Sequence, residues 1–164
     1  MNAFWAYFWP PFCAGLVVAV IAGAIGFRRR NRNAIFAAGA VVAIALAALW
    51  HGPLGAADRF AATVDRSVRA TLIAKYFPEV RGHLHRGPLT RTVLLSGPAD
   101  DFQRSQLVEF IGDVPGVERA TWSNGSGIPL IVEGAIAAIL GFLLGLVLAY
   151  LRELRRRYNA QWNW

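Results

Sequence analysis

Three long runs of apolar residues divide the chain, and each predicts a helix that crosses a membrane. The runs cover about residues 4–27, 34–51 and 128–151. About 20 apolar residues, each adding roughly 1.5 Å of helix, cross a hydrocarbon core of roughly 30 Å. Between the second and third runs, residues 56–127 change to shorter apolar and polar periods typical of a folded domain outside lipid. We therefore predict an integral membrane protein with three transmembrane α-helices plus a small extracytoplasmic α/β domain.

The pattern within residues 56–127 predicts the order helix, strand, strand, helix, strand. Apolar residues recur at every fourth position between residues 58 and 76, which is typical of an amphipathic helix. Short runs at 80–86, 91–96 and 117–122 predict strands. Asp100 is a favourable N-cap for the second helix, with Gln103 three residues later as a weak capping box.

The composition supports the prediction of an integral membrane protein. Apolar residues make up 55% of the chain and charged residues only 16%, whereas a soluble domain carries roughly 25% charged residues. No charged residue falls within 1–27 or 33–57, and only one within 120–151. This distribution argues against a cytosolic enzyme and a nucleic-acid binder.

The arginines predict the orientation. Much of the net charge of +7 lies in the turn 28–32 and in the segment 152–157. Lys and Arg gather on the cytoplasmic side of membrane proteins. Both clusters are cytoplasmic only if the N-terminus and residues 56–127 are outside and the C-terminus is inside. The predicted organisation is therefore a helical hairpin (1–55), an outer domain (56–127), a third span (128–151) and a basic, aromatic cytoplasmic tail (152–164).

Small residues recur at four-residue spacing in all three spans. Such residues let helix backbones approach closely, which is how helices associate in lipid. Two interpretations stay open: the three helices pack on one another, or at least one small-residue face contacts a different protein. The predicted helix-packing residues are Gly15, Ala19 and Gly23 in the first span, Gly39, Ala43 and Ala47 in the second, and Gly134, Ala138, Gly141 and Gly145 in the third.

Glu133 is the one acid of the third span. A carboxylate inside a membrane is costly and is by default a hypothesis for a functional site. Residues 4–27 and 34–50 contain no Asp, Glu, Lys, Arg or His that could act as a relay partner. We expect Glu133 to reach water or bond a neighbouring helix, with pairing to a partner subunit and a proton or ion path as alternatives.

Aromatic residues gather near the outer end of the first span and at the C-terminus. Trp5, Trp9, Trp162 and Trp164 are predicted interfacial anchors, because an indole ring combines an apolar body with a polar edge. Docking against another membrane subunit is the alternative.

The runs Val93-Leu94-Leu95-Ser96-Gly97 and Val114-Pro115-Gly116-Val117, separated by a helix of about a dozen residues, resemble the BON domain of bacterial envelope proteins. The resemblance covers about 70 of the 164 residues and none of the spans. It implies an αββαβ fold, a periplasmic place in a Gram-negative cell, hence a bacterial inner-membrane protein, and association with membranes or other proteins. It carries over no catalytic residue. Gly97 and Gly116 are expected to supply turn conformations that other residues resist, while Pro98 departs from the family's pattern.

Candidate chemistry is sparse. His83 and His85 share one strand face, but a metal site needs three or four ligands, and only His51 could add one. Cys13 is the one cysteine, so no disulfide forms within the chain. We predict no catalytic, metal or cofactor-binding residues and expect that the protein is not an enzyme.

These expectations favour a non-catalytic accessory or scaffolding subunit of a larger inner-membrane complex, respiratory or photosynthetic among others. Its expected partners are membrane lipid and other integral membrane subunits, with no nucleic acid and no soluble small-molecule substrate. The alternative is a free-standing envelope protein whose BON-like domain binds lipid or cell-wall material. A part in a transporter or secretion apparatus, with Glu133 in a conducting path, is a third possibility.

Overall fold

The computed structural model describes residues 2–123, 125 and 127–161, and it divides into two compact units. The first, here called the α/β unit, comprises Met1–Tyr7 and Gly55–Glu133, and the second, the helix bundle, comprises Phe8–Leu54 and Gly134–Trp164. The described elements, in chain order, are α1 (Ala3–Gly26), α2 (Arg32–His51), α3 (Ala56–Ala74), β1 (Arg81–Arg86), β2 (Leu89–Ser96), α4 (Asp101–Gly112), β3 (Arg119–Thr121) and α5 (Leu130–Gln161).

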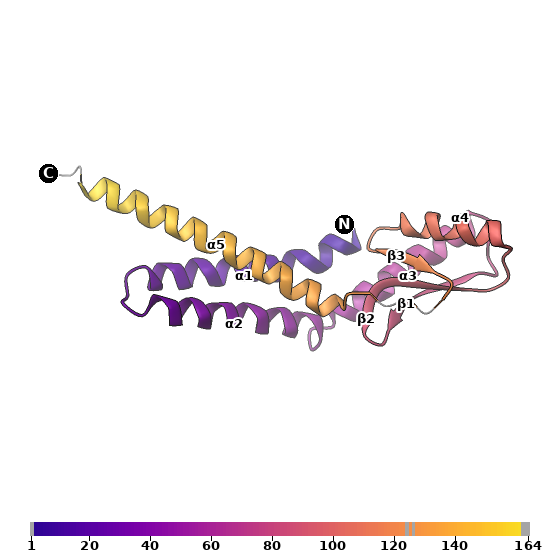
Figure 1. Ribbon diagram of the computed structural model, residues 1–164, viewed down its shortest axis with the longest axis horizontal. Coiled ribbons are helices and arrows are strands. Elements are labelled where there is room, and N and C mark those ends of the chain that lie inside the picture. The colour runs from indigo at the N-terminus through magenta and orange to yellow at the C-terminus, as the bar shows by residue number, and fades with distance from the viewer. Residues whose placement is uncertain (1, 124, 126, 162–164) are drawn as a thin grey trace. The chain divides into compact units, whose positions relative to one another are not determined.

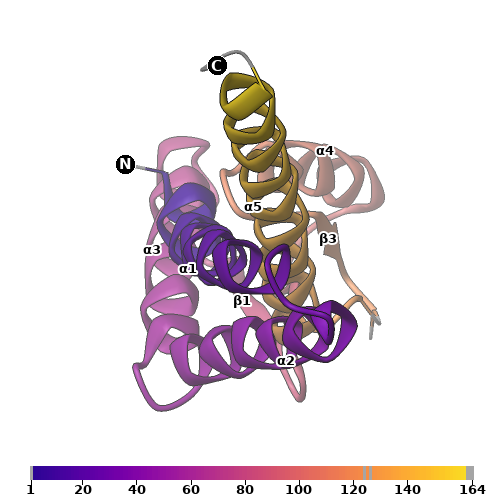
Figure 2. The ribbon, with the colours of Figure 1, turned by 90° about the vertical axis from the view of Figure 1, so that its left-hand side faces the viewer.

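The long helices α1, α2 and α5 lie side by side in the bundle (Figures 1 and 2). Their lengths are 24, 20 and 32 residues, and each is long and apolar enough to cross a membrane. The prediction of three such helices is therefore confirmed. Helix α5 continues ten residues past the apolar run, to Gln161. Glu153 bonds Arg156 and Arg157, one helical turn further on, and such pairs support a helix in a polar segment.

The α/β unit has the predicted order helix, strand, strand, helix, strand. Strands β1 and β2 are antiparallel, with Leu84 opposite Val93, while β2 and β3 are parallel, with Val93 opposite Ala120. A parallel pair needs a crossover connection, and α4 provides it. This is the element order that the BON resemblance implies, and membership of that family stays a prediction.

Large apolar side chains form the core of the α/β unit, and turn residues fix its ends. Leu72, Leu84, Leu107 and Ile111 are fully buried. The predicted capping box at the start of α4 is present, with Asp100 Oδ1 accepting from the Gln103 backbone N–H at 2.7 Å. The φ angles of Gly97 and Gly116 are 131° and 102°, so the expected turn role of both glycines is confirmed.

Candidate functional site

The small residues of α1 and α5 lie where the two helices touch. A β-carbon added to Gly15 would collide with the backbone oxygen of Ala138, and one at Gly141 with that of Phe12. Gly145 meets Leu16 in the same way. Only glycine permits this approach of one backbone to another, so the Gly141–Gly145 pair joins α5 to α1 of the same chain.

Helix α2 also directs its small residues inward. A β-carbon at Gly39 would lie 2.9 Å from the ring of Phe142, and Ala43 is fully buried. The first of the two interpretations, that the three helices pack on one another, accounts for these contacts. The remaining predicted packing residues are buried too: Ala19, Gly23, Ala47, Gly134 and Ala138.

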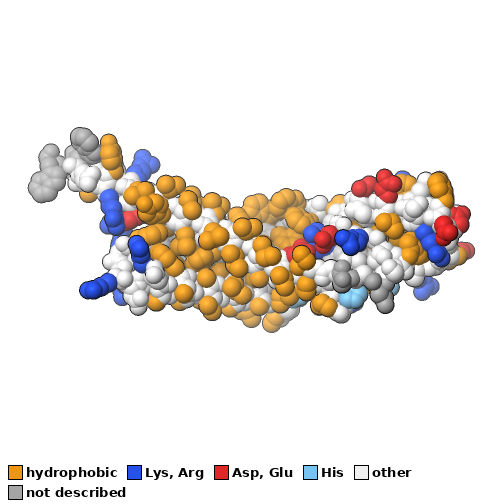
Figure 3. All heavy atoms as spheres, in the orientation of Figure 1, with side chains coloured by type: hydrophobic (Ala, Val, Ile, Leu, Met, Phe, Trp, Pro, Cys, Tyr) orange, Lys and Arg blue, Asp and Glu red, His pale blue; other side chains and the backbone are white. Residues whose placement is uncertain are grey.

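The outer surface of the bundle is formed by large apolar side chains. Val41 on α2 is 66% exposed and Leu140 on α5 is 56% exposed. Figure 3 shows hydrophobic side chains covering the face of the bundle that it displays. Such a surface suits hydrocarbon, or the surface of another membrane protein.

Glu133 pairs with Arg91 of strand β2, within the α/β unit. Arg91 Nε lies 2.8 Å from Glu133 Oε2. The Nε–H group is not aligned for a hydrogen bond, so the contact is primarily an ion pair. Arg91 also lies 3.8 Å from Glu118 Oε2 and over the ring of Phe4. The Arg91 and Glu133 side chains are only 18% and 14% exposed. The partner of Glu133 is thus a strand residue, which sequence patterns did not indicate, and not the neighbouring helix that was expected.

The predicted anchors Trp5 and Trp9 are 51% and 48% exposed. Each packs edge-on against a neighbouring aromatic ring, Phe4 and Phe12 respectively. Half-exposed indoles of this kind are consistent with an interfacial position. Trp162 and Trp164 lie outside the described residues.

The histidines and the cysteine are not brought together. His83 is exposed, and the Nδ1 of His85 lies 3.0 Å from the Pro88 carbonyl oxygen. Cys13 is free and exposed on α1. Within the described part of the chain, no three His, Cys, Asp or Glu side chains group as metal ligands.

A hollow of about 590 Å³ lies on the α/β unit beside the end of α3 and the start of α4. We call it the Tyr76 hollow. Tyr76 at its rim is 92% exposed, and Phe102, on the same first turn of α4 as Gln103, is 69% exposed. The lining comprises Tyr76, Phe77, Pro78, Glu79, Val80, Pro98, Ala99, Asp100 and Gln103.

The backbone of Tyr76 has an unusual conformation. Helix α3 ends at Ala74, and Tyr76 follows with φ of 66°, in the left-handed region where helices usually place glycine. The Phe77 N–H closes the turn on the Leu72 carbonyl at 2.9 Å. A left-handed conformation costs a non-glycine residue about 1 kcal/mol. The tyrosine therefore does not optimise the turn, and residues held in this way cluster at functional sites.

In comparisons with known proteins, no family model, curated sequence or solved structure matches this chain. The candidate sites therefore rest on the chain's own residues. Sequence patterns identify the packing glycines and Glu133 but not Arg91. They place Tyr76 on the apolar face of the predicted helix 58–76, and this is wrong, because α3 ends at Ala74 and Tyr76 is 92% exposed. The four-residue period predicts a helix to residue 76, two residues beyond the observed end of α3. The φ of Tyr76 depends on how the turn after α3 closes and has no signature in the sequence.

Proposed function

We propose that this protein is a non-catalytic accessory or scaffolding subunit of a larger membrane complex. The observation that carries the proposal is the exposed Tyr76 ring, held on a strained backbone beside an open hollow. Aromatic side chains of low conformational entropy are the residues that most often anchor protein partners. An energy-transducing complex of a bacterial inner membrane is the host that we favour.

The arginine distribution supports the orientation that this role requires. The turn between α1 and α2 contains Arg28, Arg29 and Arg30, and four more arginines follow the apolar part of α5. If both groups are cytoplasmic, the α/β unit would lie on the opposite, periplasmic side, because α2 and α5 would each cross the membrane once. The α/β unit would then brace the periplasmic face of the complex.

The chemistry of the Tyr76 hollow favours a protein over a lipid surface. Its lining includes Glu79 and Asp100 and contains no Lys or Arg. Surfaces that bind anionic membranes carry excess Lys and Arg, and acidic side chains would repel such a membrane. A protein surface with an apolar pocket and a basic rim is the complementary partner.

The proposal is tested in native membranes with two variants of Tyr76. Membranes are extracted in mild detergent, complexes are separated on a native gel, and the band containing this chain is analysed by mass spectrometry. Wild type should migrate with stoichiometric partners. Tyr76→Gly should lose the partners, although glycine relieves the left-handed backbone and is expected to raise thermal stability. Tyr76→Phe retains the ring and should keep the partners.

Migration of the wild-type chain alone, or only with copies of itself, would contradict the proposal. The free-standing envelope protein would then be the better description, and binding of the full chain to lipid or cell-wall material would be measured next. Gly141 and Gly145 are unsuitable for this test, because they join α5 to α1 and their substitution would disrupt the bundle itself.

A further inference from the structure

A pocket of about 400 Å³ lies in the helix bundle between the last turns of α1 and the C-terminal part of α5. Gly23 and Ala149 mark the close approach of the two helices at its inner end. Helix α1 ends at Gly26, three residues further on, whereas α5 runs on for twelve residues past Ala149. Because α5 extends beyond the end of α1, no part of α1 lies beside the final turns of α5, and one side of the pocket is open.

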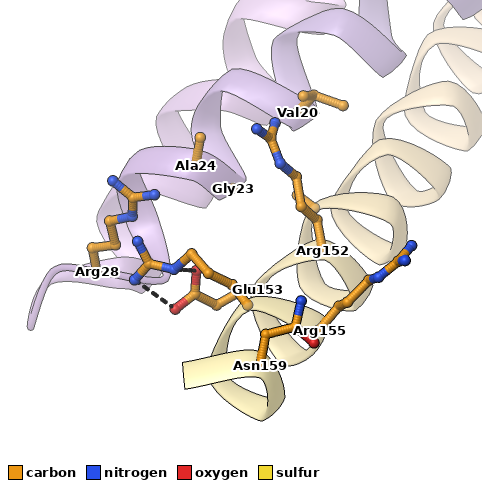
Figure 4. A pocket seen from close by; sticks show the side chains of 10 residues that line it. Val20, Gly23, Ala24, Arg28, Arg152, Glu153, Arg155 and Asn159 are labelled. Atoms are coloured by element: carbon orange, nitrogen blue, oxygen red, sulfur yellow. Dashed lines mark hydrogen bonds and ion pairs between the residues drawn. The ribbon is translucent and has the colours of Figure 1, made fainter. Parts of the chain in front are cut away.

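Four arginines line this pocket: Arg28 from the segment after α1, and Arg152, Arg155 and Arg156 from α5. Figure 4 shows Arg28 and Arg152 rising from opposite sides, with Glu153 between the two helices. Glu153 is the one acid of the lining, so the pocket has an excess of positive charge.

Glu153 is already neutralised. Its carboxylate lies 3.3 Å from Arg156 Nε and 3.2 Å from Arg157 Nε, and its side chain is only 13% exposed. Within the described residues, no ion pair or hydrogen bond engages the guanidinium groups of Arg28, Arg152 and Arg155. Their donors are therefore available to an anion from outside the chain.

The inner wall of the pocket is apolar. Val20, Gly23, Ala24 and Ala149 form it, and all four belong to helices long and apolar enough to cross a membrane. The pocket therefore combines an apolar wall with a group of arginines at the end of a membrane helix. This combination matches a molecule with a hydrocarbon part and an anionic head.

We propose that this pocket binds a phosphate group, and that the phosphate belongs to the headgroup of an anionic phospholipid. The planar guanidinium fork binds phosphate oxygens in pairs, and basic pockets between membrane helices bind phospholipid headgroups. Arginine would bind free phosphate as well, but free phosphate has no hydrocarbon part that could contact the apolar wall of Val20 and Ala24. The proposal does not depend on the function proposed above.

The test uses the full chain purified in neutral detergent. Native mass spectrometry measures binding of dioleoyl phosphatidylglycerol, with dioleoyl phosphatidylcholine as the zwitterionic comparison and inorganic phosphate as a competitor. Wild type should prefer phosphatidylglycerol. The double variant Arg28→Gln/Arg152→Gln should bind it about thirtyfold more weakly, because each of the two arginines near a membrane surface contributes about 1 kcal/mol.

A charge-matched control separates the pocket from general attraction. Arg29→Gln/Arg30→Gln removes two arginines from the neighbouring turn, outside the lining, and should keep wild-type binding. Ala24→Phe keeps every charge but fills the apolar wall, and it should weaken phosphatidylglycerol without altering the binding of inorganic phosphate. Circular dichroism of each variant verifies that the helices are intact.

Three results would overturn the proposal in whole or in part. Equal loss in both double variants would mean diffuse attraction and no pocket. Equal binding of phosphatidylglycerol and phosphatidylcholine would remove the anionic headgroup. Full displacement by millimolar inorganic phosphate, with Ala24→Phe unaffected, would support the phosphate site but assign it to free phosphate and reject the lipid.

Discussion

In the helix bundle most buried positions are Gly or Ala, with Phe142 among the exceptions, whereas the core of the α/β unit consists mainly of large apolar residues. Ala19, Ala43 and Ala138 are 0% exposed in the bundle, and in the α/β unit the same is true of Leu72 and Leu107. On the outer surface of the bundle the large apolar side chains are exposed, and Val41 is an example. Water drives the large apolar groups of the α/β unit inward. Lipid gives no such drive, so helices associate through close backbone packing.

Because of this difference, the same substitution has different consequences in the two units. Enlarging a buried residue should be worst in the bundle, where two backbones touch. Shrinking a buried residue should be worst in the α/β unit, where cavities open in a core sealed from water.

The largest effect is expected from Gly141→Leu. The new side chain would enter the space that the backbone of Phe12 occupies, and overpacking against a backbone that cannot move costs about 3 kcal/mol or more. Size-exclusion chromatography in detergent and hydrogen exchange of α1 should report a separated bundle. Ala45→Leu, at an exposed position on α2, adds comparable bulk and should leave both unchanged. A native profile for Gly141→Leu would refute close packing of α1 and α5.

Leu107→Ala tests the expectation that shrinking a buried residue is the more damaging change in the α/β unit. Leu107 is fully buried on α4, and such truncations cost about 2–5 kcal/mol through lost burial and the remaining cavity. Hydrogen exchange should accelerate throughout β2 and α4. The truncation Leu140→Ala, on the exposed face of α5, is the matched control and should have little effect. Similar losses for the two variants would contradict the contrast between the units.

Arg91→Leu should destabilise the α/β unit by about 1–3 kcal/mol, because it leaves the Glu133 carboxylate without its partner in a largely buried place. The double variant Arg91→Leu/Glu133→Leu should recover part of the loss. Arg86→Leu removes a strand arginine whose side chain is 66% exposed where it pairs with Asp65, and exposed pairs contribute little. Thermal unfolding of the three variants measures the difference. Equal losses for Arg91→Leu and Arg86→Leu would show that burial of the Arg91 pair is unimportant.

The smallest effect is expected from Asp100→Ala, which removes the capping box of α4. Loss of an N-cap costs about 1 kcal/mol. Asp100→Asn retains a capping oxygen and should recover most of the stability. Denaturant unfolding monitored by Trp122 fluorescence, whose indole N–H donates to the Arg104 carbonyl beside α4, would follow this change. A larger loss for Asn than for Ala would exclude the capping role.

Much of this architecture could be read from local patterns. Apolar runs predicted α1, α2 and α5, and the four-residue period predicted α3. The pair Asp100 and Gln103 marked the start of α4 because capping depends on residues three apart. Gly97 and Gly116 marked turns because few other residues adopt their backbone angles.

The candidate sites were less accessible. Glu133 was recognised as costly, but its partner Arg91 lies 42 positions earlier in the chain, and an ion pair over that separation has no local signature. Small-residue spacing identified faces able to pack closely, yet it left two interpretations open. The contacts of Gly15 and Gly39 with other helices of this chain support internal packing.

The sequence alone determined which segments are apolar enough for a membrane, the order of the elements and the ends of several helices, because each depends on residues within one or two turns. Only the tertiary structure decided that Arg91 meets Glu133, that Tyr76 adopts a left-handed conformation at an open hollow, and that Arg28 and Arg152 share one pocket. The ion pair and the shared pocket depend on how distant segments close on one another, and the Tyr76 conformation depends on how the turn after α3 closes. That closure is set by the sum of many packing contacts and by no single pattern along the chain.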